Sequence, residues 1–230
     1  MNHGLVPSLT IMAIDPSPLT SEQTTAAVRD ERHRLADWLM PLRQEQWSTP
    51  SLCTAWTVRN VLAHLTTTTR LTVSKVAREA IRARGSFDRM ELAMAAARAE
   101  RYSTTELLEQ LHDSAESTRR FPGSSPMDPL MDLVIHAHDI ARPLQLTYSS
   151  PAHVVTACLT HAIGNRFMGA PQRVKGLHLV STDSPWEHGS GIEVQGPDRD
   201  LLLVVSGRPD GLNTLNGPGV QTLHERLRAA

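Results

Sequence analysis

The fold predicted for this sequence rests above all on one segment, Leu130-Met131-Asp132-Leu133-Val134-Ile135-His136-Ala137-His138-Asp139-Ile140-Ala141-Arg142-Pro143-Leu144. Apolar side chains recur in it at helical spacing and form one continuous stripe, namely Leu130, Leu133, Val134, Ala137, Ile140, Ala141 and Leu144. Pro143 should end or kink this helix near Arg142, because proline lacks a backbone N–H and clashes with the preceding turn. The stretch therefore predicts a helix that buries its apolar stripe against other helices.

Helical spacing extends through the chain from about residue 20 to residue 146. Thr20 and Gln23 form a capping-box pattern, and Ser103 and Glu106 form another. Thr57 can cap a helix that runs to about residue 84, and a further helix is expected around residues 90–98. These helices predict a bundle, although periodicity alone leaves the topology of the helical domain open.

The periodicity of the apolar residues changes towards the C-terminus, with a boundary between residues 148 and 175. Residues 151–167 and 221–228 are expected to be helical, and residues 176–181 and 192–194 alternate as strands do. Residues 186–191 are expected to be a turn-rich connection. The run 201–205 is either a strand or a buried helical turn. This part predicts a small α/β module that needs the bundle for stability.

Composition excludes several classes of protein. The 230 residues are 40% hydrophobic and 20% charged, with a formal net charge of −1, so the chain is neither wholly disordered nor a generally basic nucleic-acid binder. No apolar run approaches the roughly 20 residues that span a bilayer. Two cysteines do not suggest a disulfide scaffold and fit a reducing cytoplasm.

The N-terminal residues 1–18 are expected to be a flexible segment. They contain no lysine or arginine, so they do not fit a secretory signal peptide, and Asp15-Pro16-Ser17-Pro18 disfavours regular structure. A second possible start of the protein is Met12.

Asp132 and His136 are the candidate functional residues within the central helix. Residues four apart on a helix are neighbours, and a carboxylate and an imidazole at this spacing can share a divalent metal ion. His64, on the helix that Thr57 caps, is the best candidate for a third ligand. The alternatives are a solvated helix face for Asp132 and His136 and a core histidine for His64. His138 points away from His136 and is not expected to be a ligand.

Two further residues near this pattern are ambiguous. Asp139 either orients a ligand histidine or pairs with Arg142. Cys53, shortly before a helix N-terminus, is either a thiol with a lowered pKa or, as we favour, a small packed side chain.

Three segments resemble the mycothiol-dependent maleylpyruvate isomerase family, a branch of the DinB-like metal-binding four-helix bundles. Residues 50–65 resemble the signature of the family's second helix, and residues 132–142 resemble a second signature, in which a carboxylate precedes a histidine by four residues. The C-terminal pattern is carried by Trp186-Glu187-His188-Gly189-Ser190-Gly191, by Gly196-Pro197-Asp198-Arg199-Asp200-Leu201-Leu202-Leu203 and by Gly207-Arg208-Pro209. The similarity covers about residues 20–230, and its C-terminal part is typical of actinobacterial members.

The resemblance implies an α+β fold, with a DinB-like four-helix bundle at residues 19–148 and a small C-terminal α/β domain at residues 149–230. It also implies metal ligands at His64, Asp132 and His136, with zinc as the expected ion. The sequence departs from the family at one ligand, because Asp132 stands where the family usually has glutamate. Arg208 is a candidate catalytic residue that would clamp a substrate carboxylate, or else a surface arginine.

The function that the resemblance implies is that of a metalloenzyme that uses mycothiol, a low-molecular-weight thiol, as cosubstrate. It would catalyse either cis–trans isomerisation of a maleylpyruvate-type electrophile or thiol S-transfer. We expect a monomer or homodimer that acts on a small molecule, without nucleic-acid or membrane partners. The alternatives are a metal- or small-ligand-binding stress protein without turnover and a carrier with an apolar cavity in residues 150–230.

Overall fold

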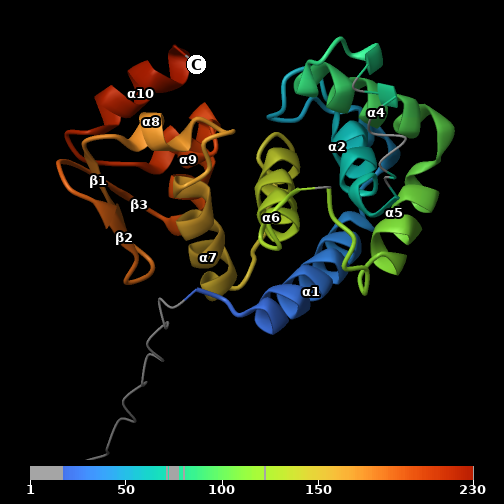
Figure 1. Cartoon of the computed structure of the whole chain (residues 1–230), viewed down its shortest axis with the longest axis horizontal. Helices are drawn as coiled ribbons and strands as arrows, with labels where there is room; N and C mark the ends of the chain where they lie inside the picture. The colour runs from blue at the N-terminus through green and yellow to red at the C-terminus, as the bar shows by residue number, and fades with distance from the viewer. Residues whose placement is uncertain (1–17, 71, 73–77, 80, 122, 230) are drawn as a thin grey trace, which may run out of the picture.

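The computed structural model describes residues 18–70, 72, 78–79, 81–121 and 123–229. The predictions for residues 1–17, including a start at Met12, lie outside these ranges. The chain has an α+β fold, with a helical part on one side and a mixed part with a small sheet on the other (Figure 1).

The helical part is built around α6, which lies between α2 on one side and α7 of the C-terminal part on the other (Figure 1). Its elements within the described ranges are α1 (Ser21–Leu39), the 3-10 turn η1 (Gln44–Ser48), α2 (Val58–Leu65), the 3-10 turn η2 (Thr68–Arg70), α4 (Phe87–Arg101), α5 (Thr104–Asp113) and α6 (Asp128–Ala141). Helix α1 packs on α5 and α6, and α2 packs on α4, α5 and α6.

Both predicted capping boxes are present. At the start of α1, the Thr20 hydroxyl accepts a hydrogen bond from the Gln23 backbone N–H, and the Gln23 side chain accepts one from the Thr20 N–H. Ser103 and Glu106 form the same reciprocal pair at α5. The predicted end of α6 is also confirmed, because the helix stops at Ala141, immediately before Arg142 and Pro143.

Helix α2 is much shorter than the sequence predicted, since it ends at Leu65 instead of continuing to about residue 84. The hydroxyls of Thr66 and Thr67 both donate to the Ala63 carbonyl. Threonine side chains that bond the backbone in this way compete with the helical hydrogen bonds, and their branched β-carbons restrict the rotamers available in a helix. The four-threonine run that follows Leu65 therefore accounts for the early end.

Helix α6 is buried almost all round rather than on one stripe. Its apolar residues pack on α1, α2 and α7, and the side chains of His136 and Asp139 are also buried. The alternative of a solvated face is therefore wrong for His136, whereas Asp132 keeps 34% of its side-chain surface exposed.

The C-terminal part combines a three-stranded sheet with helices. Its elements are α7 (Ala152–Ile163), α8 (Ala170–Val174), β1 (Leu177–Ser181), β2 (Glu187–Gly189), β3 (Ile192–Gly196), α9 (Asp198–Val205), the 3-10 turn η3 (Pro209–Thr214) and α10 (Val220–Arg228). The strand order is β2-β1-β3, with β1 antiparallel to β2 and parallel to β3. The expected turn at residues 186–191 thus contains a strand, and the run 201–205 is helical.

Polar contacts join the two parts across α6. The Arg142 side chain at the end of α6 forms an ion pair with the fully buried Asp200 of α9. Helix α7 packs on both α6 and α9. In the described ranges, no helix is long and apolar enough to cross a membrane.

Two neighbouring side chains at the end of α1 provide a test of this packing. Leu39 is fully buried, whereas 68% of the Met40 surface is exposed. We expect Leu39→Ala to lower the free energy of unfolding by about 2–5 kcal/mol, because it leaves a cavity in the core. The matched control Met40→Ala should change it by less than about 0.5 kcal/mol. Urea denaturation of both variants measures the difference, and equal effects would contradict the packing of α1.

Candidate functional site

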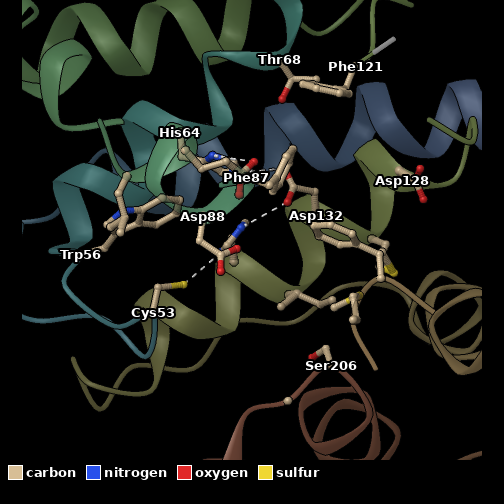
Figure 2. Close-up of a pocket in the computed structure, with 18 of the residues that line it drawn as sticks. Cys53, Trp56, His64, Thr68, Phe87, Asp88, Phe121, Asp128, Asp132 and Ser206 are labelled. Atoms are coloured by element: carbon tan, nitrogen blue, oxygen red, sulfur yellow. Dashed lines mark hydrogen bonds and ion pairs between the residues drawn. The ribbon is translucent and has the colours of Figure 1, made fainter. Parts of the chain in front are cut away.

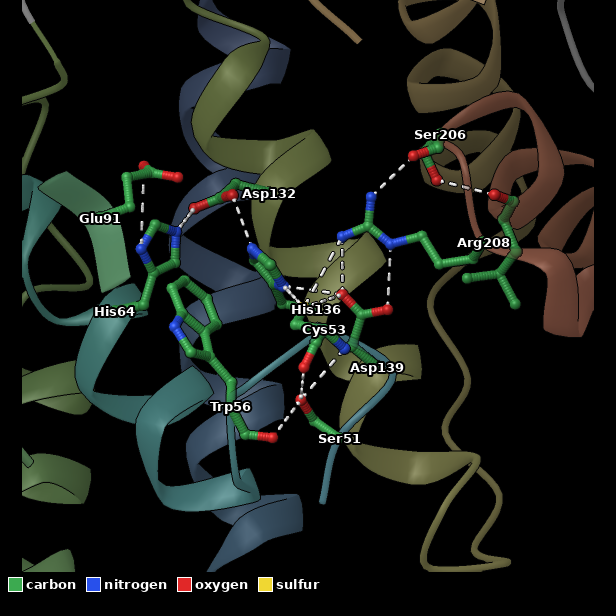
Figure 3. A network of polar contacts seen from close by, with 11 residues as sticks. Ser51, Cys53, Trp56, His64, Glu91, Asp132, His136, Asp139, Ser206 and Arg208 are labelled. Atoms are coloured by element: carbon green, nitrogen blue, oxygen red, sulfur yellow. Dashed lines mark hydrogen bonds and ion pairs between the residues drawn. The ribbon is translucent and has the colours of Figure 1, made fainter. Parts of the chain in front are cut away.

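The three residues predicted as metal ligands meet at one place between α2 and α6. His136 Nε2 lies 3.2 Å from one Asp132 carboxylate oxygen, and His64 Nε2 lies 3.4 Å from the other. One ligand atom from each residue can be chosen so that all three lie within 4.8 Å of one another. The packing of α2 against α6 therefore brings His64 to the helical pair that the sequence spacing predicted (Figure 3).

Asp132 stands between two imidazoles, and this determines its charge state. Burial would raise the pKa of its carboxyl, but the adjacent His64 and His136 outweigh burial and hold the pKa well below its usual range. The site thus keeps an ionised carboxylate next to two imidazole nitrogens. These are donor types that divalent transition metals accept.

The other nitrogen of His136 is held by a buried carboxylate. Asp139 has no exposed surface, and its Oδ2 lies 2.8 Å from His136 Nδ1. Such a contact fixes the orientation of an imidazole and leaves its Nε2 directed towards Asp132. Of the two roles considered for Asp139, the structure favours orientation of His136, because Arg142 pairs with Asp200 instead.

Arg208 forms a two-point contact with the same carboxylate. Its Nη2 donates to Asp139 Oδ2 at 2.8 Å and its Nε to Oδ1 at 3.1 Å, while Nη1 donates to the Ser206 carbonyl. Burial would raise the pKa of Asp139, yet Arg208 and His136 hold it well below its usual range. Arg208 follows Gly207, whose positive φ of 93° suits glycine at the turn after α9.

Cys53, which the sequence favoured as a small packed side chain, is a member of this cluster. Its Sγ lies 3.0 Å from Asp139 Oδ2 and 3.6 Å from His136 Nδ1. The loop that carries it is tied to α6, because the Leu52 N–H donates to the Asp139 carbonyl. Cys53, His136 and Asp139 are close enough to hold a second ion, but the Arg208 guanidinium already neutralises Asp139 and would repel a cation there.

Glu91 and Trp56 complete the surroundings of His64. Glu91 Oε1, on α4, lies 3.9 Å from His64 Nδ1, and burial raises the pKa of the Glu91 carboxyl. The Trp56 ring lies 4.9 Å from the His64 ring, centroid to centroid, and its buried indole N–H has no hydrogen-bond partner among the described residues. A glutamate on a helix face gives no sequence signal of this proximity.

A cavity of about 1190 Å³ opens beside these groups. It is lined from both parts of the chain, by His64, Asp132 and His136 on one side and by the segment 206–210 on another (Figure 2). This cavity lies between the two parts, whereas the hydrophobic-carrier alternative expected one within residues 150–230. The position of the three donors at its wall makes them accessible to a small molecule.

The buried His138 of α6 is directed elsewhere, as predicted. Its ring lies 6.0 Å from that of Tyr148, and burial lowers its pKa to about 4. His161 pairs with Asp128 at 2.7 Å. Neither histidine belongs to a potential metal-binding group in the part of the chain that the structure describes.

A double-mutant cycle tests the buried contact between Asp139 and Arg208. We expect Asp139→Asn and Arg208→Gln to lower the free energy of unfolding non-additively, with a coupling of about 1–3 kcal/mol, because each change leaves the other buried partner unpaired. The exposed pair Arg43–Glu45 is the control and should show no detectable coupling. Urea denaturation in EDTA gives all the values, and additive effects would show that the contact does not stabilise the site.

Comparison with solved structures gives two matches to the whole fold. A crystal structure of the mycothiol-dependent maleylpyruvate isomerase aligns with a TM-score of 0.52 at 13% identity, and a histidine-to-alanine mutant of that enzyme aligns with 0.51 at 16% identity. Each alignment covers 87% of this chain and 93% of the other. A search of curated proteins found no match to this sequence.

Family models match both parts of the chain. The model of the mycothiol maleylpyruvate isomerase N-terminal domain matches residues 28–141, which include the three convergent donors. The model of the MDMPI C-terminal domain matches residues 149–226, which include Arg208. Together with the shared fold, these matches show that the chain belongs to the mycothiol-dependent maleylpyruvate isomerase family.

Proposed function

We propose that this chain is a metalloenzyme that uses mycothiol to attack an electrophilic small molecule. The observation that carries the proposal is the convergence of His64, Asp132 and His136 at the wall of the cavity. In this proposal the three residues hold one divalent cation. Two imidazoles and a carboxylate suit zinc, which commonly takes three protein ligands in catalytic sites and leaves a further position open.

The residues present fit such an ion although the carboxylate is the shorter aspartate. Asp132 already approaches both imidazole nitrogens within 3.4 Å without any change of the helix. Its ionised state and the fixed ring of His136 match what a cation requires of its ligands. The substitution at this position therefore does not by itself argue for a lost site.

The chemistry has two external contributors. A bound divalent cation favours the thiolate form of a thiol near it. Mycothiol supplies that sulfur, which adds to a double bond and either leaves after rotation, giving cis–trans isomerisation, or stays attached, giving S-transfer.

Residues around the three donors hold His136 in place. Asp139 holds the His136 ring, and Arg208 holds Asp139 in turn. Both carboxylate oxygens of Asp139 are occupied by the guanidinium, so we assign to Arg208 a positioning role through Asp139 in place of the predicted clamp. Trp56 packs beside His64, with 4.9 Å between the two ring centroids.

Metal content tests the proposal directly. We expect the native protein to hold about one divalent ion per chain and His64→Ala or His136→Ala to weaken its binding by more than about a hundredfold, because each change removes a ligand. The control is His112→Ala, whose side chain is exposed on α5. Elemental analysis and competition with a chelator measure the binding.

Turnover then separates catalysis from simple binding. With mycothiol present, protein loaded with metal should either isomerise a maleylpyruvate-type electrophile, with the thiol regenerated, or consume the thiol by joining it to the electrophile. His136→Ala should abolish the excess over the uncatalysed rate in either assay. Equal metal content in all variants would refute the metal site. A bound metal with neither isomerisation nor thiol consumption would favour the alternative, a binding protein without turnover.

A further inference from the structure

An aromatic cluster stands at the cavity beside the candidate metal site. The sequence contains three phenylalanines, and all of them line this cavity. Phe87 lies 5.8 Å from Phe121 and 5.0 Å from Phe167, measured between ring centroids, with the rings edge to face. They come from three separate segments, namely the start of α4, the loop before α6 and the loop after α7.

This cluster is open to the cavity instead of being sealed in the core. Phe167 keeps 74% of its surface exposed, and Phe87 and Phe121 are half-buried. Four of the chain's eight methionines line the same cavity: Met90, Met94, Met131 and Met168. Methionine is flexible and polarisable, so such a wall adapts to flat apolar ligands. Exposed apolar surface gathered in one concavity is typical of a ligand site.

The wall beside the aromatic cluster carries acidic side chains. The carboxylates that line the cavity are Asp88, Glu91, Asp128, Asp132 and Asp210. Among the described lining residues no lysine contributes, and the one arginine, Arg208, is already bonded to Asp139. Asp132 is assigned to the cation, whereas Asp88 directly follows Phe87 and Glu91 lies one turn further along α4. A ligand carboxylate placed against this part of the wall, away from the cation, would meet like charge.

We propose that the electrophile is a neutral molecule with a flat aromatic body, which stacks on the phenylalanines while its reactive carbon faces the three donors. This inference rests on the proposed function. In the reaction, the thiol sulfur bonds to the β-carbon of an unsaturated ketone, the π pair moves to the α-carbon, and that carbon takes a proton that replaces the one the thiol released. The cavity, with a volume of about 1190 Å³, has room for mycothiol together with such a molecule.

Three electrophiles test the proposal on metal-loaded protein with mycothiol. They are 4-phenyl-3-buten-2-one, which is neutral and aromatic, 3-buten-2-one, which is neutral and small, and maleylpyruvate, which is a diacid. Each kcat/KM is divided by the uncatalysed rate constant. We expect the aromatic ketone to exceed both others by about tenfold or more, which corresponds to burial of one ring. A preference for maleylpyruvate would overturn the proposal.

Variants of the lining assign the preference to the residues that the proposal names. Phe87→Ala and Phe167→Ala should lower the ratio between the aromatic and the small ketone about fivefold or more, and the exposure of Phe167 makes the second change safe for folding. Asp88→Asn should raise the rate for maleylpyruvate relative to the aromatic ketone severalfold. The control Ile192→Ala, in β3 and outside the cavity, should leave every ratio unchanged. Unchanged ratios in the phenylalanine variants would overturn the proposal.

A binding measurement tests the inference about the ligand independently of the proposed reaction. If the metal-loaded protein neither joins mycothiol to an electrophile nor isomerises maleylpyruvate, the proposed function fails, and the neutral dye N-phenyl-1-naphthylamine then tests the cavity alone. Its fluorescence should rise and shift to the blue with the native protein, and Phe87→Ala should weaken its binding about fivefold or more. Absence of binding, or equal binding by both proteins, would overturn the inference about the ligand.

Discussion

The buried carboxylate of Asp139 is the contact on which the arrangement of the site depends. It receives two hydrogen bonds from Arg208 of the C-terminal part, and it fixes the ring of His136 within the helical part. The same residue's carbonyl anchors the loop of Cys53 and Trp56. Because a buried charge without partners is unstable, docking of the C-terminal part and orientation of the imidazole occur together. The candidate site is therefore a product of the whole fold.

The sequence predicted what local spacing determines. Asp132 and His136 share a helix face because they are four residues apart, and the caps at Thr20 and Ser103 follow from short motifs. The sequence-based prediction was wrong at the end of α2, where the side-chain hydrogen bonds of Thr66 and Thr67 stop the helix. It also missed contacts between residues that are far apart in the chain. Arg208 is 69 residues from Asp139 and 155 from Cys53, so only tertiary packing reveals their contact. His64 was predicted from its place on the helix that Thr57 caps, and the family resemblance implied the same residue.

Family membership and the lining of the cavity carry different kinds of information. The two family models and the shared fold relate the chain to proteins named for their dependence on mycothiol, whereas the lining of the cavity is a property of this chain's own side chains. At 13–16% identity the solved relatives establish the fold and leave the ligand open. The phenylalanines, methionines and carboxylates that line the cavity contact any ligand bound there, so they determine which ligands this chain prefers.

The ion pairs that cross between the parts also constrain how such proteins diversify. Arg142 with Asp200 and Asp139 with Arg208 each place one partner on either side of the same boundary. A recombination event that exchanged the C-terminal part for that of a distant relative would strand a buried charge unless the incoming segment supplied both complements. Exchange of C-terminal parts between relatives must therefore keep both members of each ion pair. Hybrid proteins that keep both pairs are expected to retain the arrangement of the candidate site.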